Sequence, residues 1–144
     1  MKRFLILFLL LMVAACSNKP GDSEIQSQVL PLLATASTKD IADIKNLRKT
    51  NGYETDGNTY TIDIAYDLVF KVNYADLAKT SMPKDSPDGL IEGLQSVITG
   101  FNLLGLNVTY GNFKAGDRFV KQDHLTFIKT ENGWMLTEPP ESPL

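Results

Sequence analysis

The sequence predicts an α+β domain in which helices pack on one face of a curved antiparallel sheet. Three observations lead to this prediction. Every even residue from 60 to 72 is apolar or aromatic, which is typical of a strand with one face on a core. Residues 86–101 carry an apolar stripe with helical spacing. Near the end of the chain, Asn132-Gly133 separates two apolar-rich segments, as in a β-hairpin.

A first helix is predicted at the start of the domain, with Asp22 or Ser23 as its N-cap. Pro31 falls within the pattern, so the helix either ends near Leu30 or kinks. We expect this helix to close the core, and a partner-binding helix is the alternative. Its apolar face would consist of Ile25, Val29, Leu32 and Leu33.

The segment Thr38–Thr50 is ambiguous between helix and strand. Its apolar residues are spaced by three, which suits a helix capped by Thr38. However, it leads into Asn51-Gly52 and Asp56-Gly57, which are typical hairpin dipeptides, and then into the alternating strand Thr59–Val72. We therefore favour a strand that ends in a long hairpin. The length of the second strand, against a usual five or six residues, predicts a curved sheet.

Asp63 and Asp67 share the polar face of this strand. Four residues of strand separate them by about 13 Å, which is too far for a shared proton or a single metal ion. We expect both to be solvated charges that keep the sheet soluble.

A loop with a helical turn at Tyr74–Lys79 should follow, and then a helix with Ser86 as its N-cap and Pro87 at its first position. From Leu106 the chain is expected to return to strands, including Val108 and Tyr110, before a turn at 114–117. The apolar face of the helix would consist of Leu90, Ile91, Leu94, Val97, Ile98 and Phe101.

The last long strand is predicted over Arg118–Thr130, with a bulge near Lys121–Asp123 because the parity of its apolar residues changes there. Trp134, after the hairpin turn, should anchor the core. The Pro-rich tail, residues 139–144, is expected to fray, so the single domain would span residues 23–138.

No motif in the chain indicates a catalytic, cofactor or metal site. The chain has no Gly-rich phosphate loop and no cluster at metal-ligand spacing, and His124, the only histidine, is expected at the surface without an orienting partner. The aromatic residues that could line a pocket are Tyr66, Phe70, Phe101 and Phe127.

The first 16 residues have the layout of an export signal: two cations, a ten-residue apolar run from Phe4 to Val13, two alanines and the only cysteine. The run is shorter than the roughly 20 residues of a transmembrane helix. Val13-Ala14-Ala15-Cys16 resembles the lipobox of bacterial lipoproteins. This resemblance implies that residues 1–15 are removed, that the Cys16 thiol carries a diacylglycerol thioether, and that its amine is acylated with a fatty acid such as palmitate. A plain secretory signal, with Cys16 as a lone thiol, is the alternative.

Loss of the signal lowers the basic residues from 14 to 12 against 17 acidic ones, so the formal net charge of −3 becomes −5. This acidic balance, without a Lys/Arg cluster, argues against nucleic acid as a partner. Residues 16–22 form the lipidated cysteine and a polar tether of about 20 Å at most. In a bacterium with two membranes, Ser17 after the cysteine implies sorting to the periplasmic face of the outer membrane.

The order of elements resembles the cystatin-like and nuclear-transport-factor-like (NTF2-like) cones. Residues 113–117 and 129–134 are similar to segments of small envelope lipoproteins of unknown function. We therefore expect a non-enzymatic binding or assembly module of the envelope, with the membrane and an envelope protein as partners. A cone that binds a small apolar ligand, or an isomerase- or dehydratase-type enzyme, is the alternative. The sequence gives no indication of oligomeric state.

Overall fold

The structure, a computed structural model of the chain, describes residues 18–80 and 103–144. The lipobox with Cys16, and the helix expected over residues 86–101, lie outside these residues. The described elements are α2 (Asp22–Leu33), α3 (Ala36–Ile41), β1 (Ala42–Asp56), β2 (Thr59–Phe70), α4 (Tyr74–Thr80), a helix over residues 103–110, β3 (Arg118–Thr130) and β4 (Gly133–Leu136).

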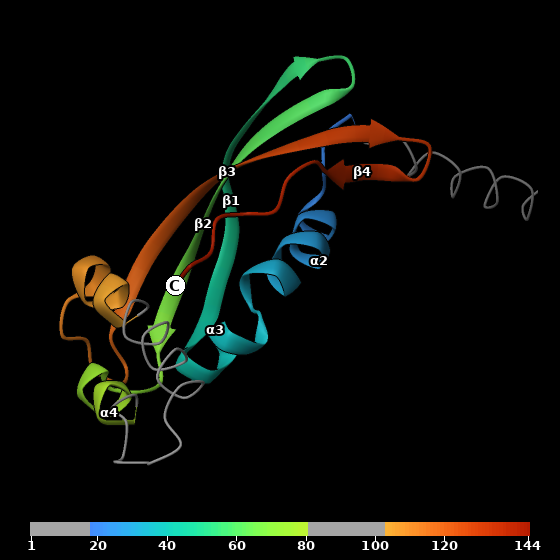
Figure 1. Cartoon of the computed structure of the whole chain (residues 1–144). Helices are drawn as coiled ribbons and strands as arrows, with labels where there is room; N and C mark the ends of the chain where they lie inside the picture. Colours follow the sequence, from blue (N-terminus) through green and yellow to red (C-terminus); the bar gives the residue numbers. More distant parts are fainter. Residues whose placement is uncertain (1–17, 81–102) are drawn as a thin grey trace, which may run out of the picture.

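The four strands form one open antiparallel sheet in the order β1-β2-β3-β4. Figure 1 shows long, bent strands, with α2 and α3 on one face of the sheet and the tips of the two hairpins diverging. The predicted α+β class with a curved antiparallel sheet is confirmed.

The core lies between the helices and the even-numbered face of β2. One cluster joins α2 to the half of the sheet near the two hairpin turns. A second cluster joins the other half of the sheet to the helix over residues 103–110. The predicted core role of Trp134 is confirmed. The first cluster includes Ile25, Val29, Leu33, Tyr60, Ile62, Ile64, Tyr66, Leu125, Phe127 and Trp134.

The first helix differs from its prediction in its N-cap, and of the two alternatives at Pro31 an end near Leu30 is wrong. Its N-cap is Gly21, whose backbone N–H donates to the Glu24 carboxylate at 2.9 Å. Pro31 lies inside the last turn without ending the helix early, and Leu32 is 44% exposed, outside the buried stripe. A carboxylate in the first turn also favours the helix through its interaction with the helix dipole.

The ambiguous segment divides between both predicted structures. Residues up to Ile41 form the short helix α3, capped by the Thr35 side chain, and the strand begins at Ala42. The hairpin turn follows Asp56, whereas Asn51-Gly52 lies within β1, where the pairing with β2 shifts register. The favoured strand with a long hairpin is thus confirmed from residue 42, and of the two hairpin dipeptides Asp56-Gly57, not Asn51-Gly52, marks the turn.

The C-terminal third corrects two predictions. Residues 103–110 are helical, so the strand expected at Val108 and Tyr110 is wrong; Leu106 and Tyr110, one turn apart, are buried. The bounds of β3 are confirmed, but the bulge is not, because β3 pairs with β2 without a register shift. Val120, which prompted the bulge, simply faces outward and is 53% exposed.

The Pro-rich tail packs on the domain instead of fraying. Figure 1 shows the last residues running back from β4 across the face of the sheet. The Thr137 N–H donates to the Thr126 carbonyl at 2.9 Å, and the Tyr110 hydroxyl donates to the buried Pro143 carbonyl. Leu144 packs against the second core cluster. The tail therefore forms part of the walls of the hollows described next.

Candidate functional site

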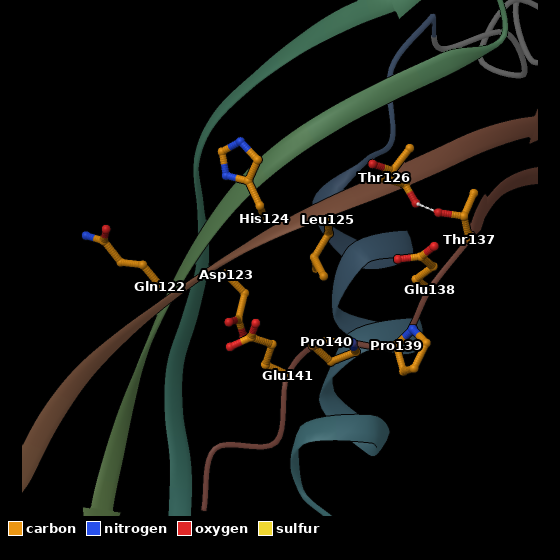
Figure 2. Close-up of a pocket in the computed structure, with 10 residues that line it drawn as sticks. All are labelled: Gln122, Asp123, His124, Leu125, Thr126, Thr137, Glu138, Pro139, Pro140 and Glu141. Carbon is orange, nitrogen blue, oxygen red and sulfur yellow. Dashed lines mark hydrogen bonds between the residues drawn. The ribbon is translucent and has the colours of Figure 1, made fainter. Parts of the chain in front are cut away.

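A hollow of about 470 Å³ lies between β3 and the C-terminal tail (Figure 2). Residues 122–126 of β3 and residues 137–141 of the tail line it. Among the residues that the structure describes, its charged lining consists of Asp123, Glu138 and Glu141, with no Lys or Arg. We call it the acidic hollow. Figure 2 shows the carboxylates of Asp123 and Glu141 turned toward one another, whereas His124 points away from them.

Strand register explains why a carboxylate faces the hollow. Asp123 has the same parity in β3 as Leu125 and Phe127, so it points to the helix-covered face of the sheet. It pairs with Ile64, and Tyr66 is two residues further along β2 on the same face. The phenol of Tyr66 therefore lies close to the Asp123 side chain.

The surroundings perturb the acid-base behaviour of this pair. Burial raises the pKa of Asp123, and the charge of Glu141 adds to this effect, while the Tyr66 hydroxyl and Lys121 oppose it. Burial, followed by the charge of Asp123, raises the pKa of Tyr66 well above its ordinary value. Tyr66 is therefore a neutral hydroxyl at physiological pH. Tyr66 Oη and Asp123 Oδ2 are both buried, and each group affects the pKa of the other through a hydrogen bond between the two side chains.

A second hollow of about 500 Å³ lies between α3, the helix over residues 103–110, and the end of the tail. We call it the apolar hollow. Its apolar walls include Ile41, Leu106, Tyr110 and Leu144, and its polar groups include the buried Thr38. The Lys121 side chain reaches this hollow, with its ammonium 5.5 Å from the centre of the Tyr110 ring.

Of the aromatic residues expected to line a pocket, the three that the structure describes line neither hollow. Tyr66, Phe70 and Phe127 are fully buried within the two core clusters, and Phe101 lies outside the described residues. Asp123 was predicted only as part of the bulge near Lys121–Asp123 and not as a site residue. The signal that could have identified it is its parity, because a carboxylate stands in line with Leu125 and Phe127 on the core face.

The expectation that both carboxylates on the outer face are solvated is wrong for Asp67 and holds only in part for Asp63, whose side chain is 27% exposed. Asp67 is 1% exposed; it accepts a hydrogen bond from Asn46 Nδ2 at 2.5 Å and lies 3.3 Å from Arg118 Nε. Asn46 belongs to β1 and Arg118 to β3. The carboxylate of the central strand thus links it to both of its neighbours.

Asp63 repeats this arrangement further along β2. Its Oδ1 lies 2.5 Å from His124 Nδ1 of β3, and its Oδ2 accepts from Asn51 Nδ2 of β1 at 3.2 Å. The His124 side chain is 68% exposed, as expected for a surface histidine, and Asp63 is the orienting partner that the sequence did not reveal. Asp63 and Asp67 thus each connect β2 to both β1 and β3 on the outer face of the sheet.

Within residues 18–80 and 103–144, no three His, Cys, Asp or Glu side chains are placed to hold a metal ion. None of the helices in this part of the chain combines the length and the apolar character needed to cross a membrane. The chain has no significant similarity to any family model, curated protein or solved structure with which it was compared.

Proposed function

We propose that this protein is a bacterial envelope lipoprotein, a non-enzymatic binding or assembly module that a lipid on Cys16 holds at the membrane. The observation that carries the proposal is the lipobox Val13-Ala14-Ala15-Cys16, preceded by a cationic end and a ten-residue apolar run. Two or three acyl chains would hold the protein firmly, whereas one chain gives only marginal binding.

The position of the folded domain supports a role close to the bilayer. Helix α2 begins at Asp22, so the tether between Cys16 and the first helix can span only about 20 Å. The module would work next to the membrane surface, where a partner or ligand in the envelope could reach the hollows beside the tail. In a bacterium with two membranes, Ser17 favours the periplasmic face of the outer membrane.

Metabolic labelling with a fatty-acid analogue tests the anchor. The wild type should incorporate the label and Cys16→Ala should not. The matched variant Ser17→Asp should keep the label but move to the inner membrane in fractionated envelopes. Equal labelling of the wild type and Cys16→Ala would refute the lipid anchor. Recovery of the lipidated protein with its bound partner from native envelopes then tests the binding role.

A module that binds a small apolar ligand is the second candidate, and the apolar hollow is the observation that favours it. Its volume of about 500 Å³ lies within the range of ligand sites, from about 300 to 1,000 Å³. Organic extraction of the purified protein followed by mass spectrometry should then reveal a bound small molecule. An isomerase- or dehydratase-type enzyme would need an inward carboxyl group with a perturbed pKa, and Asp123 is the described residue that meets this requirement.

A further inference from the structure

A single cationic side chain lies in the wall of the apolar hollow. Lys121 is the only charged side chain among the described residues that line this hollow. It has the same parity in β3 as the core residues Leu125 and Phe127, so the strand directs it toward the helix-covered face of the sheet. We propose that the apolar hollow binds an aliphatic carboxylate, whose hydrocarbon chain packs on the apolar walls and whose head group pairs with the Lys121 ammonium.

The lining of the apolar hollow changes from apolar to polar between its floor and its mouth. The buried apolar residues of the lining are Leu106, Tyr110 and Pro143. The exposed residues with hydroxyl groups are Thr35, Ser37, Thr109 and Ser142. Burial of methylene groups on the floor is favourable, whereas a charged head group is favoured only where it keeps water or polar partners. The hollow therefore fits an amphiphile better than a wholly apolar molecule.

The described part of the chain supplies no ion-pair partner for Lys121. Its ammonium lies 5.5 Å from the centre of the Tyr110 ring, a contact that leaves its N–H donors available. Its charge also acts on Asp123, the next residue along this face of β3, but the two side chains form no ion pair, and Asp123 lines the acidic hollow. A half-buried ammonium beside apolar walls is complementary to an anion that enters from the mouth.

The charge of the lining selects the kind of head group. One ammonium balances the single charge of a carboxylate, whereas a doubly charged phosphate would keep one charge without a partner. A neutral hydroxyl forms a weaker hydrogen bond than a carboxylate, and an alkylammonium would be repelled. This inference rests on the second candidate function, a module that binds a small ligand, and names the class of that ligand. It does not depend on the lipid anchor.

Photo-crosslinking tests the proposal with the full chain, extracted from membranes, checked by intact mass and reconstituted in phosphatidylcholine nanodiscs. The probe is a diazirine derivative of octanoic acid, and mass spectrometry of the digested protein locates its attachment. We expect attachment in peptides that contain residues 105–110 or 142–144. Octanoate should compete with the probe at a concentration about tenfold lower than octanol requires, since only the carboxylate forms a charge-assisted hydrogen bond. A neutral alcohol enters the bilayer more readily than a carboxylate, so partitioning into the nanodisc cannot produce this preference.

Four variants separate the charge of the hollow from its volume. Lys121→Gln should weaken competition by octanoate about tenfold or more and remove its advantage over octanol, whereas Lys121→Arg should keep that advantage. Lys45→Gln removes a 56% exposed cation from the outer face of β1 and is the matched control. A Cβ on Gly105 meets nothing within 4 Å, so Gly105→Leu should occupy part of the hollow without a clash and weaken octanoate and octanol alike.

The head-group preference of the wild type decides the proposal even if a variant proves unstable in thermal melting. Equal competition by octanoate and octanol would overturn this inference and leave a small apolar ligand as the second candidate function. Absence of labelling in the hollow would overturn both. Stronger competition by octyl phosphate or octylamine than by octanoate, or a preference for octanoate that survives in Lys121→Gln, would also overturn the pairing of a carboxylate with Lys121.

Discussion

The ion pair between the buried Asp67 and the exposed Arg118 gives a sharp test of how the sheet is held together. Asp67 is 1% exposed, whereas the Arg118 side chain is 58% exposed. The pair is therefore asymmetric. Removing the guanidinium leaves a buried carboxylate with the Asn46 amide but without a cation, whereas removing the carboxylate leaves a guanidinium that water can solvate. Arg118→Gln should consequently destabilise the protein more than Asp67→Asn.

The separation sets the size of the effect. Two unit charges 3.3 Å apart attract by about 5 kcal/mol at an effective dielectric constant of about 20. Solvent around Arg118 screens part of this attraction, so we expect Arg118→Gln to lower the free energy of unfolding by about 2 to 3 kcal/mol. Asp67→Asn should lower it by about 1 to 2 kcal/mol, because the loss of the pair is offset by no longer burying a charge.

Urea unfolding of the protein in mild detergent, followed by the fluorescence of Trp134, measures both variants and their combination. The double variant should be about as stable as Asp67→Asn alone, because it no longer buries a carboxylate and the loss of Arg118 adds nothing once its partner is gone. Lys114→Gln, an exposed cation in the turn before β3, is the matched control and should change stability by less than about 0.5 kcal/mol. A cost for Arg118→Gln as small as that of the control would refute this account of Asp67.

Three further predictions concern the acidic hollow, the tail and the hairpin between β1 and β2. The folded protein raises the pKa of Asp123, so the ionised form of Asp123 opposes folding. Asp123→Asn should therefore raise the melting temperature at pH 7 to 8. This gain should vanish below about pH 4, where the Asp123 carboxyl group is protonated in both the folded and the unfolded state. A gain independent of pH would exclude this cause. Tyr110→Phe removes the hydrogen bond to the Pro143 carbonyl and should lower the free energy of unfolding by about 1 kcal/mol. Relative to the wild type, amide hydrogen exchange should become faster in the tail and change less in β4. Unchanged exchange in the tail would show that this bond does not hold the tail. A Cβ at Gly52 would lie 2.8 Å from an aromatic carbon of Tyr60 and 2.6 Å from a carbon of Lys49, so Gly52→Ala should lower the free energy of unfolding by about 1 to 3 kcal/mol. Gly57→Ala, whose Cβ would meet nothing within 4 Å, is the control and should be nearly neutral. Equal stabilities of the two variants would contradict the close approach at Gly52.

The sequence predicted β2 and β3 well because alternation and turn dipeptides are local signals. It placed the start of β3 at Arg118 and the start of β2 at Thr59, both as observed. It misjudged residues 103–110 because apolar residues two apart, such as Val108 and Tyr110, suggested a strand. The structure buries Leu106 and Tyr110 at a spacing of four and leaves Val108 exposed.

The errors about charged residues have a different origin. Polar residues at alternate positions of a strand normally face water, but Asp67 is covered by side chains that register and the irregular pairing of β1 bring to it. Likewise, no local pattern shows that the tail, more than ten residues further along the chain, returns to Asp123. Tertiary contacts of this kind determine the hollow, and alternation along one strand cannot reveal them.

The intact mass of the protein extracted from bacterial membranes tests the central claim most directly. Removal of the first 15 of the 144 residues leaves 129 residues beginning at Cys16. We expect the mass of this chain plus a diacylglycerol group and an amide-linked acyl chain, with both modifications on an N-terminal Cys16 peptide after proteolysis. A mature chain with an unmodified cysteine, or one that still begins at Met1, would contradict it.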